Sequence, residues 1–423
     1  MISAARYHYG RPYSLLWTAR VVSFLGDTLA QVTLLLLAAR QAHPALAVSL
    51  LLLAQTLPRL LGPIAGLVSD RAELRVLMVG CDVGQAMLVG AIALLAPPFG
   101  VTLALVAAMT CLATFFLPAS QSALPALVAM DDLGDANALL RVGFNLSHAA
   151  GPPLAGLLIA VASSSSVLLF DALTFLCSAA LLIRLPALKG SAPASPERAG
   201  GVLLSARIGL AFIRRHATAR TVTLGLFIVT LFVALDNVGL VFLAERSFGA
   251  GSAGYGLLLA GYGVGMIAGP LIVLRLGGGR DSSRILVAGC AVMGVGTMLC
   301  GLSPALWIAM ACQVTVGVGN GWQNVANDTL IQQTVPYELL GRVFGVVYSA
   351  PYAALLITYA AGGLLLSLTS PRAVFVIAGA GTLAAALLIR LLLGDERRAE
   401  PPASGGVPGP GPRQFHVKHR ASV

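Results

Sequence analysis

Seven ionisable side chains lie inside otherwise apolar stretches of this sequence: Arg20, Asp27, Arg59, Asp82, Asp171, Asp236 and Asp328. Placing a charge in hydrocarbon costs several kcal/mol, so ionisable residues in such stretches usually serve a function. A carboxylate in a low-dielectric cavity holds a proton readily and releases it when its access to water changes. These aspartates therefore indicate proton exchange or the binding of a cationic ligand. We find no metal-ligand spacing, catalytic dyad or phosphate loop, so we predict neither a metal, a cofactor nor an enzyme.

The composition is that of a membrane protein. Hydrophobic residues make up 57% of the 423 residues and charged residues only 10%, whereas a soluble domain carries roughly 25% charged residues. The length accommodates about twelve spanning helices of about 20 residues each. We place these helices at 14–38, 46–68, 76–96, 101–124, 139–162, 165–186, 219–244, 254–276, 284–303, 305–329, 343–367 and 372–394. The predicted fold class is an all-α membrane protein.

The distribution of basic residues predicts the orientation of the chain. Most of the 27 Lys and Arg residues fall on one side of the membrane if both chain ends are cytoplasmic, as the positive-inside rule requires. We therefore predict a multi-pass protein of the cytoplasmic membrane with both termini inside. The net charge of +10 reflects this topology and does not indicate nucleic-acid binding.

The sequence divides into two halves that resemble each other, because Asp27 and Asp236 take matching places in their halves. Internal duplication of this kind is typical of transporters that bind substrate near the middle of the membrane. The predicted domains are an N-tail (1–13), a six-helix bundle (14–186), a cytoplasmic linker with an interfacial helix (187–218), a second six-helix bundle (219–394) and a disordered C-tail (395–423).

The short connector between the second and third segments carries a dense group of charges. Its spacing, Gly66-x3-Asp70-Arg71-x3-Arg75, resembles the signature of the major facilitator superfamily. The sequence departs from that signature at Glu73, where a glycine is usual, and at Leu74, where a basic residue is usual. The resemblance implies two pseudo-symmetric six-helix bundles and transport by alternating access. We expect Gly66 to let another helix come close.

Further stretches resemble the macrolide-efflux and enterobactin-exporter-like branch of this superfamily. They are Asp135-Ala-Asn-Ala-Leu139 with Asn145 and Gly151-Pro152, Phe170-Asp-Ala-Leu-Thr-Phe175, and Gln332-Gln-Thr-Val-Pro336 leading into Gly341-Arg342. Gly151-Pro152 with Gly156 also looks like the helix motif of antiporters. The resemblance implies proton-coupled export of a lipophilic or amphipathic small molecule by a monomer embedded in lipid. Import or facilitated diffusion of a nutrient or metabolite is the alternative.

The resemblance also assigns roles to the buried charges. In the resembled fold the segments 14–38 and 219–244 line a central cavity, so we predict Asp27 as the proton or substrate site and Asp236 as the second choice. The alternative is a structural Asp27 that pairs with Arg20 or Arg59. Arg59 lies deep in its segment and requires an acidic partner, either Asp27 or Asp82.

The connector charges are predicted to form a latch, defined as contacts made only when the cytoplasmic side is shut. Asp70 and Arg71 belong to it, with Asp70 meeting the start of the 343–367 segment near Gly341 and Arg342. Arg75 would meet Asp131 or Asp132, and Asp281 would meet Arg141 by the repeat. Such contacts bias a two-state equilibrium. The alternative is that these charges only fix topology.

A polar run in the 305–329 segment comprises Gln323, Asn324, Asn327 and Asp328. We expect these side chains to contact substrate or to complete the cytoplasmic gate. Hydrogen bonding between helices is the alternative.

Overall fold

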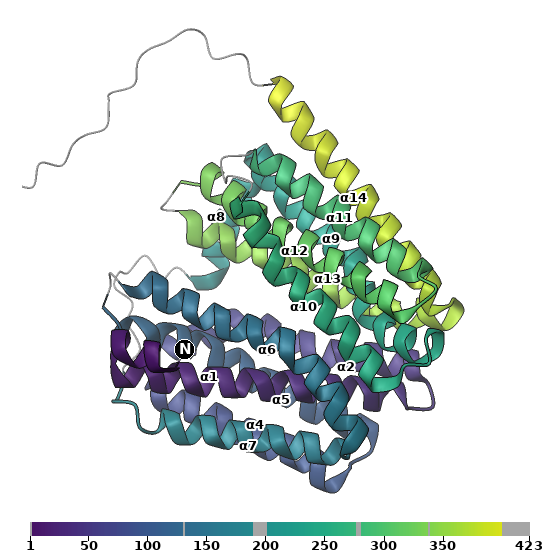
Figure 1. The fold of residues 1–423 in the computed structure, drawn as a ribbon. Helices are drawn as coiled ribbons and strands as arrows, with labels where there is room; N and C mark the ends of the chain where they lie inside the picture. Colours follow the sequence, from purple (N-terminus) through teal and green to yellow (C-terminus); the bar gives the residue numbers. More distant parts are fainter. Residues whose placement is uncertain (1, 130–131, 189–200, 276–280, 337–338, 400–423) are drawn as a thin grey trace, which may run out of the picture.

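The computed structural model describes residues 2–129, 132–188, 201–275, 281–336 and 339–399. All regular elements in these ranges are helices (Figure 1). The first half contains α1 (Ile2–Ala39), α2 (Pro44–Thr56), η1 (Leu57–Leu61), α3 (Gly62–Arg71), α4 (Leu74–Leu95), α5 (Phe99–Ala123), η2 (Leu124–Ala126), α6 (Leu133–Val161) and α7 (Ser164–Leu182). The second contains α8 (Gly201–Arg215), α9 (Ala217–Phe242), η5 (Leu243–Ser247), α10 (Gly251–Arg275), α11 (Ser282–Leu302), α12 (Leu306–Thr334), α13 (Leu340–Leu368) and α14 (Pro371–Ala399).

Each of the twelve predicted segments coincides with helix. Ten helices in the described ranges are long and apolar enough to cross a membrane. The helices α6 and α12, both 29 residues long, are not among these ten. In α12, polar residues such as Asn320 and Gln323 lower the hydropathy. The predicted all-α membrane fold is confirmed.

Two local expectations differ from the structure. The predicted 46–68 helix is not continuous, since a 3-10 segment at Leu57–Leu61 separates α2 from α3. Pro58 lies at its start, and proline lacks the N–H that would continue an α-helix. The predicted N-tail (1–13) is helical from Ile2, with a break at Gly10, whose φ of 79° is non-helical.

The two bundles meet along two symmetry-related helix pairs, α6 with α10 and α2 with α13. Glycines bring these helices close: an added Cβ at Gly256 of α10 would lie 2.5 Å from Pro152 O of α6. An added Cβ at Gly363 of α13 would lie 2.8 Å from Ala45 O of α2. These glycines therefore determine how closely the bundles can approach.

The hydrophobic core shows that the bundles are joined at one end only. One cluster combines the end of α1, the start of α2, the end of α9 and the start of α10. Two other clusters lie at the opposite end, one within each bundle. We call the joined end the distal seal, because it lies away from the start of α1. In Figure 1 the bundles converge at the right and diverge towards the left, where the N-terminus lies.

Candidate functional site

A cavity of about 320 Å³ lies between the bundles, immediately below the distal seal. Its walls come from both halves: Thr28, Gln31 and Phe144 on one side, and residues of α9, α10 and α13 on the other. None of the fifteen lining residues is charged. The volume is at the lower end of the range for sites that bind drug-sized ligands.

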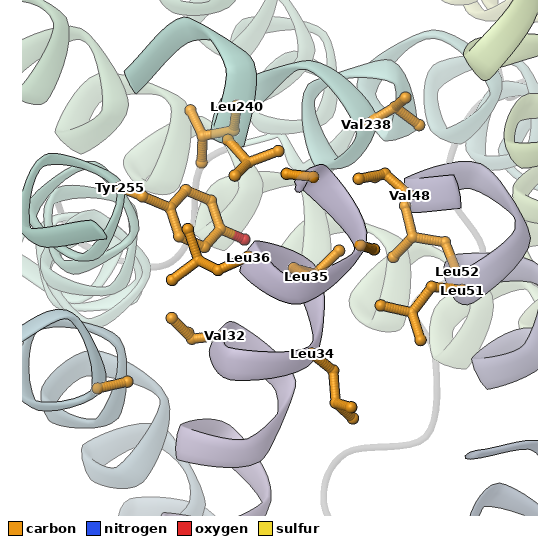
Figure 2. Close-up of a cluster of buried hydrophobic side chains, with 14 of the residues drawn as sticks. Val32, Leu34, Leu35, Leu36, Val48, Leu51, Leu52, Val238, Leu240 and Tyr255 are labelled. Carbon is orange, nitrogen blue, oxygen red and sulfur yellow. The ribbon is translucent and has the colours of Figure 1, made fainter. Parts of the chain in front are cut away.

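The distal seal closes the cavity with aliphatic side chains. Figure 2 shows Val32, Leu35 and Leu36 of α1 facing Leu240 and Tyr255 of the second half. Leu36 is 1% exposed and Leu35 is 3% exposed. The labelled side chains from α1 at this end are therefore apolar and buried.

Polar groups of the second half converge on the cavity. Asn237 of α9 donates a hydrogen bond from Nδ2 to the Tyr359 hydroxyl of α13 (2.9 Å). Tyr255 and Tyr262 of α10 also line the cavity. Tyrosines supply large apolar faces with one hydroxyl each, which suits aromatic or amphipathic ligands.

Asp27 is the charged group of α1 nearest to this cavity wall. It is exposed and precedes Gln31, a cavity-lining residue, by one helical turn. Its carboxylate interacts electrostatically with Arg20 and Arg59. The carboxylate is thus accessible and surrounded by protein charges, as a proton or cation site requires.

Arg20 and Arg59 lie near Asp27 without forming an ion pair with it in the described residues. The Arg20 guanidinium lies 4.4 Å from the centroid of the Phe24 ring and 5.2 Å from that of Phe116. Arg59 lies exposed in η1. Asp27, one of the two partners expected for Arg59, interacts with it electrostatically, and a direct ion pair between them stays a prediction.

Asp236 lies on α9 next to Asn237 but is buried, with 8% exposure. Gln313 of α12 donates from Nε2 to both carboxylate oxygens, at 3.3 and 3.4 Å. Asp236 does not line the cavity. The structure thus places the two predicted carboxylates differently: Asp27 is accessible and Asp236 is enclosed in the second bundle.

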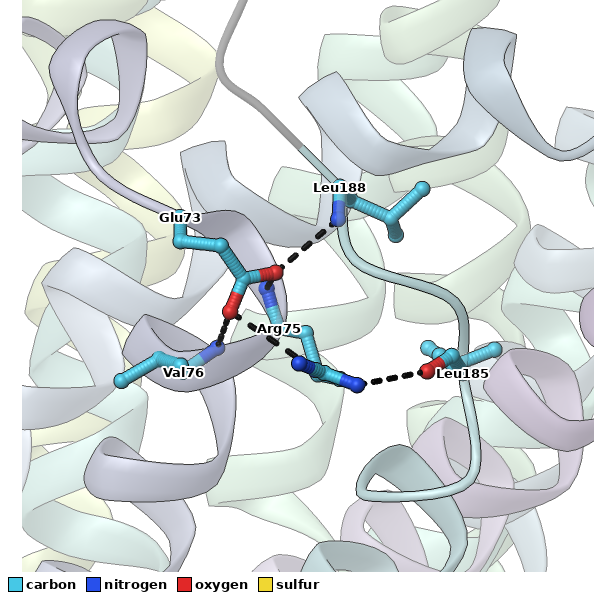
Figure 3. A network of polar contacts seen from close by, with 5 residues as sticks. All are labelled: Glu73, Arg75, Val76, Leu185 and Leu188. Atoms are coloured by element: carbon cyan, nitrogen blue, oxygen red, sulfur yellow. Dashed lines mark hydrogen bonds and ion pairs between the residues drawn. The ribbon is translucent and has the colours of Figure 1, made fainter.

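Within the connector, Glu73 and Arg75 bind the end of the first bundle (Figure 3). Glu73 Oε1 accepts from the backbone N–H of Leu188 (2.9 Å), and Oε2 accepts from that of Val76 (3.0 Å). Arg75 pairs with Glu73 (3.6 Å) and donates to Leu185 O (3.1 Å). We call this set the linker clamp, because Leu188 lies at the start of the linker between the bundles.

Two expectations for the connector concern the state in which the cytoplasmic side is shut, and this conformation does not test them. Arg75 was expected to meet Asp131 or Asp132, but in this conformation its partners are Glu73 and Leu185. Gly66 was expected to admit another helix, yet an added Cβ there would meet nothing within 4 Å. Both differences agree with a molecule that is open at the end where the connector lies.

The electrostatics of the clamp favour ionised Glu73. Partial burial alone would raise the pKa of Glu73, but hydrogen bonds from the backbone N–H groups of Leu188, Val76 and Arg75, together with the Arg75 charge, lower it below its usual value. Glu73 is also the N-cap of α4. The residue that breaks the family signature therefore has a structural function of its own.

Other predicted latch residues are only partly described. Arg71 is exposed, and Arg342 is half-buried at the start of α13. Asp281 caps α11 through the Ser283 N–H (3.1 Å) and pairs with Arg284 (3.5 Å). Asp131 lies outside the described residues, and so do the side chains of Asp70 and Arg141 and the surroundings of Gly341. The latch remains a prediction.

The predicted antiporter motif of α6 contacts both bundles. Gly151 packs against Thr28 of α1, where an added Cβ would lie 2.6 Å from Thr28 Cγ2. Pro152 lines the cavity. Gly156 faces the backbone of α10, and its carbonyl accepts from Ser252 Oγ (3.3 Å). The Asn145 side chain lies outside the described residues.

The polar run of α12 is divided between two environments. Gln323 and Asn327 are buried, and Asn327 Oδ1 has no hydrogen-bond partner among the described residues. Asn324 donates to Asn320 Oδ1 (2.9 Å), and Asp328 accepts from the Tyr348 hydroxyl of α13. None of the run lines the cavity, so its bonds fit the alternative of hydrogen bonding within the bundle.

Sequence comparison identifies the family. The chain matches the transmembrane secretion effector family of the major facilitator superfamily over residues 10–413, and it belongs to that family. The family, the two bundles and the cavity between them define the chain as a membrane transporter.

Three relatives, two of them efflux proteins, show which branch of the superfamily the chain is similar to. The chain is 29% identical to an uncharacterised major-facilitator-type transporter, YfiS, of Bacillus subtilis, covering 86% of this chain and 89% of the relative. It is 26% identical to the multidrug efflux pump Tap of Mycolicibacterium fortuitum (81% and 86% covered). It is 22% identical to macrolide efflux protein A of Streptococcus pyogenes (79% and 84% covered). The predicted resemblance to efflux proteins of this superfamily is confirmed.

The fold also matches solved transporter structures. A crystal structure of a POT family transporter superimposes with a TM-score of 0.73 at 11% identity, covering 91% of this chain and 96% of that one. At this identity the match supports the fold alone.

Proposed function

We propose that this chain exports lipophilic or amphipathic small molecules from the cytoplasm in exchange for protons, by alternating access. The observation that carries the proposal is the accessible carboxylate of Asp27, beside a cavity that lies between two bundles sealed at one end only. The efflux relatives support the direction of transport. The protein would act as a monomer in the cell membrane, with both termini in the cytoplasm.

With this orientation, the conformation is open to the cytoplasm. The distal seal faces outward, so a substrate enters the cavity from inside or from the inner leaflet. The uncharged, tyrosine-rich wall accepts the apolar body of the substrate. A proton bound at Asp27 and a cationic substrate compete for the same negative charge, and this competition couples the two fluxes.

The experiment uses everted membrane vesicles that contain the protein, with a pH gradient generated by respiration. Addition of ethidium or erythromycin should dissipate part of the gradient in the wild type, because each exported molecule releases protons. Asp27→Asn should abolish this response. Glu245→Gln, which removes a carboxylate in η5 that does not line the cavity, serves as the control and should behave as wild type. A normal response from Asp27→Asn refutes the assignment.

The alternative, uptake of a nutrient, makes an opposite prediction in cells. Overexpression of an exporter lowers ethidium accumulation, and a protonophore restores it. Unchanged ethidium and erythromycin accumulation, with or without the protonophore, counts against export.

A further inference from the structure

Two buried carboxylates lie behind Asp27, inside the first bundle and away from the cavity wall. Asp82 of α4 is 1% exposed and Asp171 of α7 is 0% exposed. Both carboxylates interact electrostatically with Asp27. The cavity-lining residues include neither of them, so direct contact with substrate does not explain their presence.

These two carboxylates accept few hydrogen bonds. Oδ2 of Asp82 and Oδ2 of Asp171 have no hydrogen-bond partner among the described residues, and neither has Nε of Arg20. Oδ1 of Asp171 accepts from the Thr174 hydroxyl at 3.3 Å, a long bond. Ionised carboxylates with free oxygens are costly to bury, whereas a protonated carboxyl needs fewer donors.

Gly26 allows Asp171 to reach α1. An added Cβ at Gly26 would clash with Oδ1 of Asp171 and with Oγ1 of Thr174. The missing side chain therefore lets the Asp171 carboxylate lie against the α1 backbone, next in sequence to Asp27. This close approach connects the accessible carboxylate to the buried one.

The charges around the carboxylates of Asp27, Asp82 and Asp171 do not balance. The groups that face it are Arg20 and Asp27 from α1, Asp82 and Cys81 from α4, Cys111 from α5, and Asp171 with Thr174 and Ser178 from α7; the charge of Arg59 in η1 reaches Asp27. Behind the accessible Asp27 lie two buried carboxylates, Asp82 and Asp171, and one guanidinium, that of Arg20. An uncompensated buried charge costs several kcal/mol, so the excess of one is removed most cheaply by binding a proton.

We propose that Asp27, Asp82 and Asp171, with Arg20, form one proton-binding cluster that holds a shared proton inside the first bundle. This proposal rests on the proposed function for the direction of proton flow. The described residues contain no group of three His, Cys, Asp or Glu side chains arranged to hold a metal ion, which favours protons over a cation as the occupant.

In the loading step, a hydronium ion in the cavity gives its proton to the Asp27 carboxylate and leaves as water. The proton exchanges between Asp27 and the two buried carboxylates, Asp171 at Gly26 and Asp82, and it leaves the cluster through Asp27 before a cationic substrate occupies that carboxylate. The proton belongs to the cluster as a whole, since strongly interacting carboxylates titrate together.

The test is infrared spectroscopy of the purified full chain in detergent, which detects the carbonyl stretch of protonated carboxyl groups without any substrate. The wild type should show buried protonated carboxyl bands at neutral pH that disappear on alkalisation. Asp171→Asn and Asp82→Asn should each lose this signal, and proton release on alkalisation should fall from one per molecule to none. Glu245→Gln in η5, outside the cluster, should change neither measurement.

A second variant, which keeps every carboxyl group, distinguishes loss of the cluster from misfolding. Thr174→Val retains the side-chain volume and should shift the frequency of the Asp171 band without removing it. Bands and proton release unchanged in both aspartate variants overturn the cluster. If the bands behave as expected but ethidium fails to discharge the pH gradient, the cluster stands and proton-coupled export falls.

Discussion

Replacing Gly256 with alanine should shift the protein away from the conformation described here. Gly256 of α10 packs against α6 across the boundary between the bundles, and an added Cβ would lie 2.5 Å from Pro152 O. Ordinary contacts begin near 3.4 Å, so α6 and α10 must separate by about 1 Å. Alternating access requires this same boundary to open in the other state, where the methyl group meets no obstacle.

The magnitude follows from the packing. Adding a methylene to a tightly packed boundary typically costs about 1–3 kcal/mol. If the cost applies only to the sealed state, the ratio of outward-open to inward-open molecules rises about 5- to 150-fold, since about 1.4 kcal/mol is a factor of ten. A helix-propensity gain from glycine to alanine of about 1 kcal/mol applies to both states and cancels.

The assay measures exposure of the distal seal from outside. Leu36, which is 1% exposed, is replaced with cysteine in a variant that lacks the six native cysteines, and its labelling by a membrane-impermeant maleimide is timed in whole cells. Gly256→Ala should accelerate labelling. The control is Gly90→Ala in α4, where an added Cβ meets nothing within 4 Å. Equal labelling rates in both variants would refute the reasoning.

The remaining predictions concern single contacts. Glu73→Ala removes the N-cap of α4 and the acceptor for the Leu188 amide. Because a cap contributes about 0.5–2 kcal/mol, hydrogen exchange at the Leu188 amide should accelerate about 2- to 30-fold. Asp281→Asn, a change in the cap of α11, should leave exchange at Leu188 unchanged. Because the pKa of Glu73 is lowered in the folded protein, this contribution is present above its usual pKa of about 4.3 and is lost as pH falls below it, which exchange measured across that range would show. Gln313→Leu should lower the thermal midpoint, because Asp236 would lose its donor at a cost of about 1–3 kcal/mol, whereas Asn324→Leu, at an exposed position, should have little effect.

Much of the architecture was predictable because a membrane imposes regularity on a sequence. Helices must be long and apolar to span a bilayer, so their positions follow from hydropathy. The break at Leu57–Leu61 was missed, although Pro58 signalled it. The prediction gave more weight to the apolar residues on both sides of Pro58 than to that single proline.

The cavity wall was not predictable in the same way. Tyr255, Tyr262 and Tyr359 are ordinary aromatic residues of apolar helices, and only the convergence of α10 and α13 on one cavity brings them together. Asn237 adjoins Asp236 in the sequence, yet the two side chains face different surroundings. A helix turns by about 100° between neighbours, so adjacent polar residues carry no information about which one faces the cavity.

The linker clamp explains why a departure from the family signature need not abolish transport. Glu73 stands where the signature has glycine, and its carboxylate holds Arg75 and Leu188 within the first bundle. Arg75 can join the predicted latch only by leaving Glu73, so the two contacts compete for one guanidinium. An exposed ion pair of this kind contributes about 0–1 kcal/mol, which is small enough for closure to reverse. The substitution therefore adjusts the balance between open and closed states, while Arg71, exposed in this conformation, remains available to the latch.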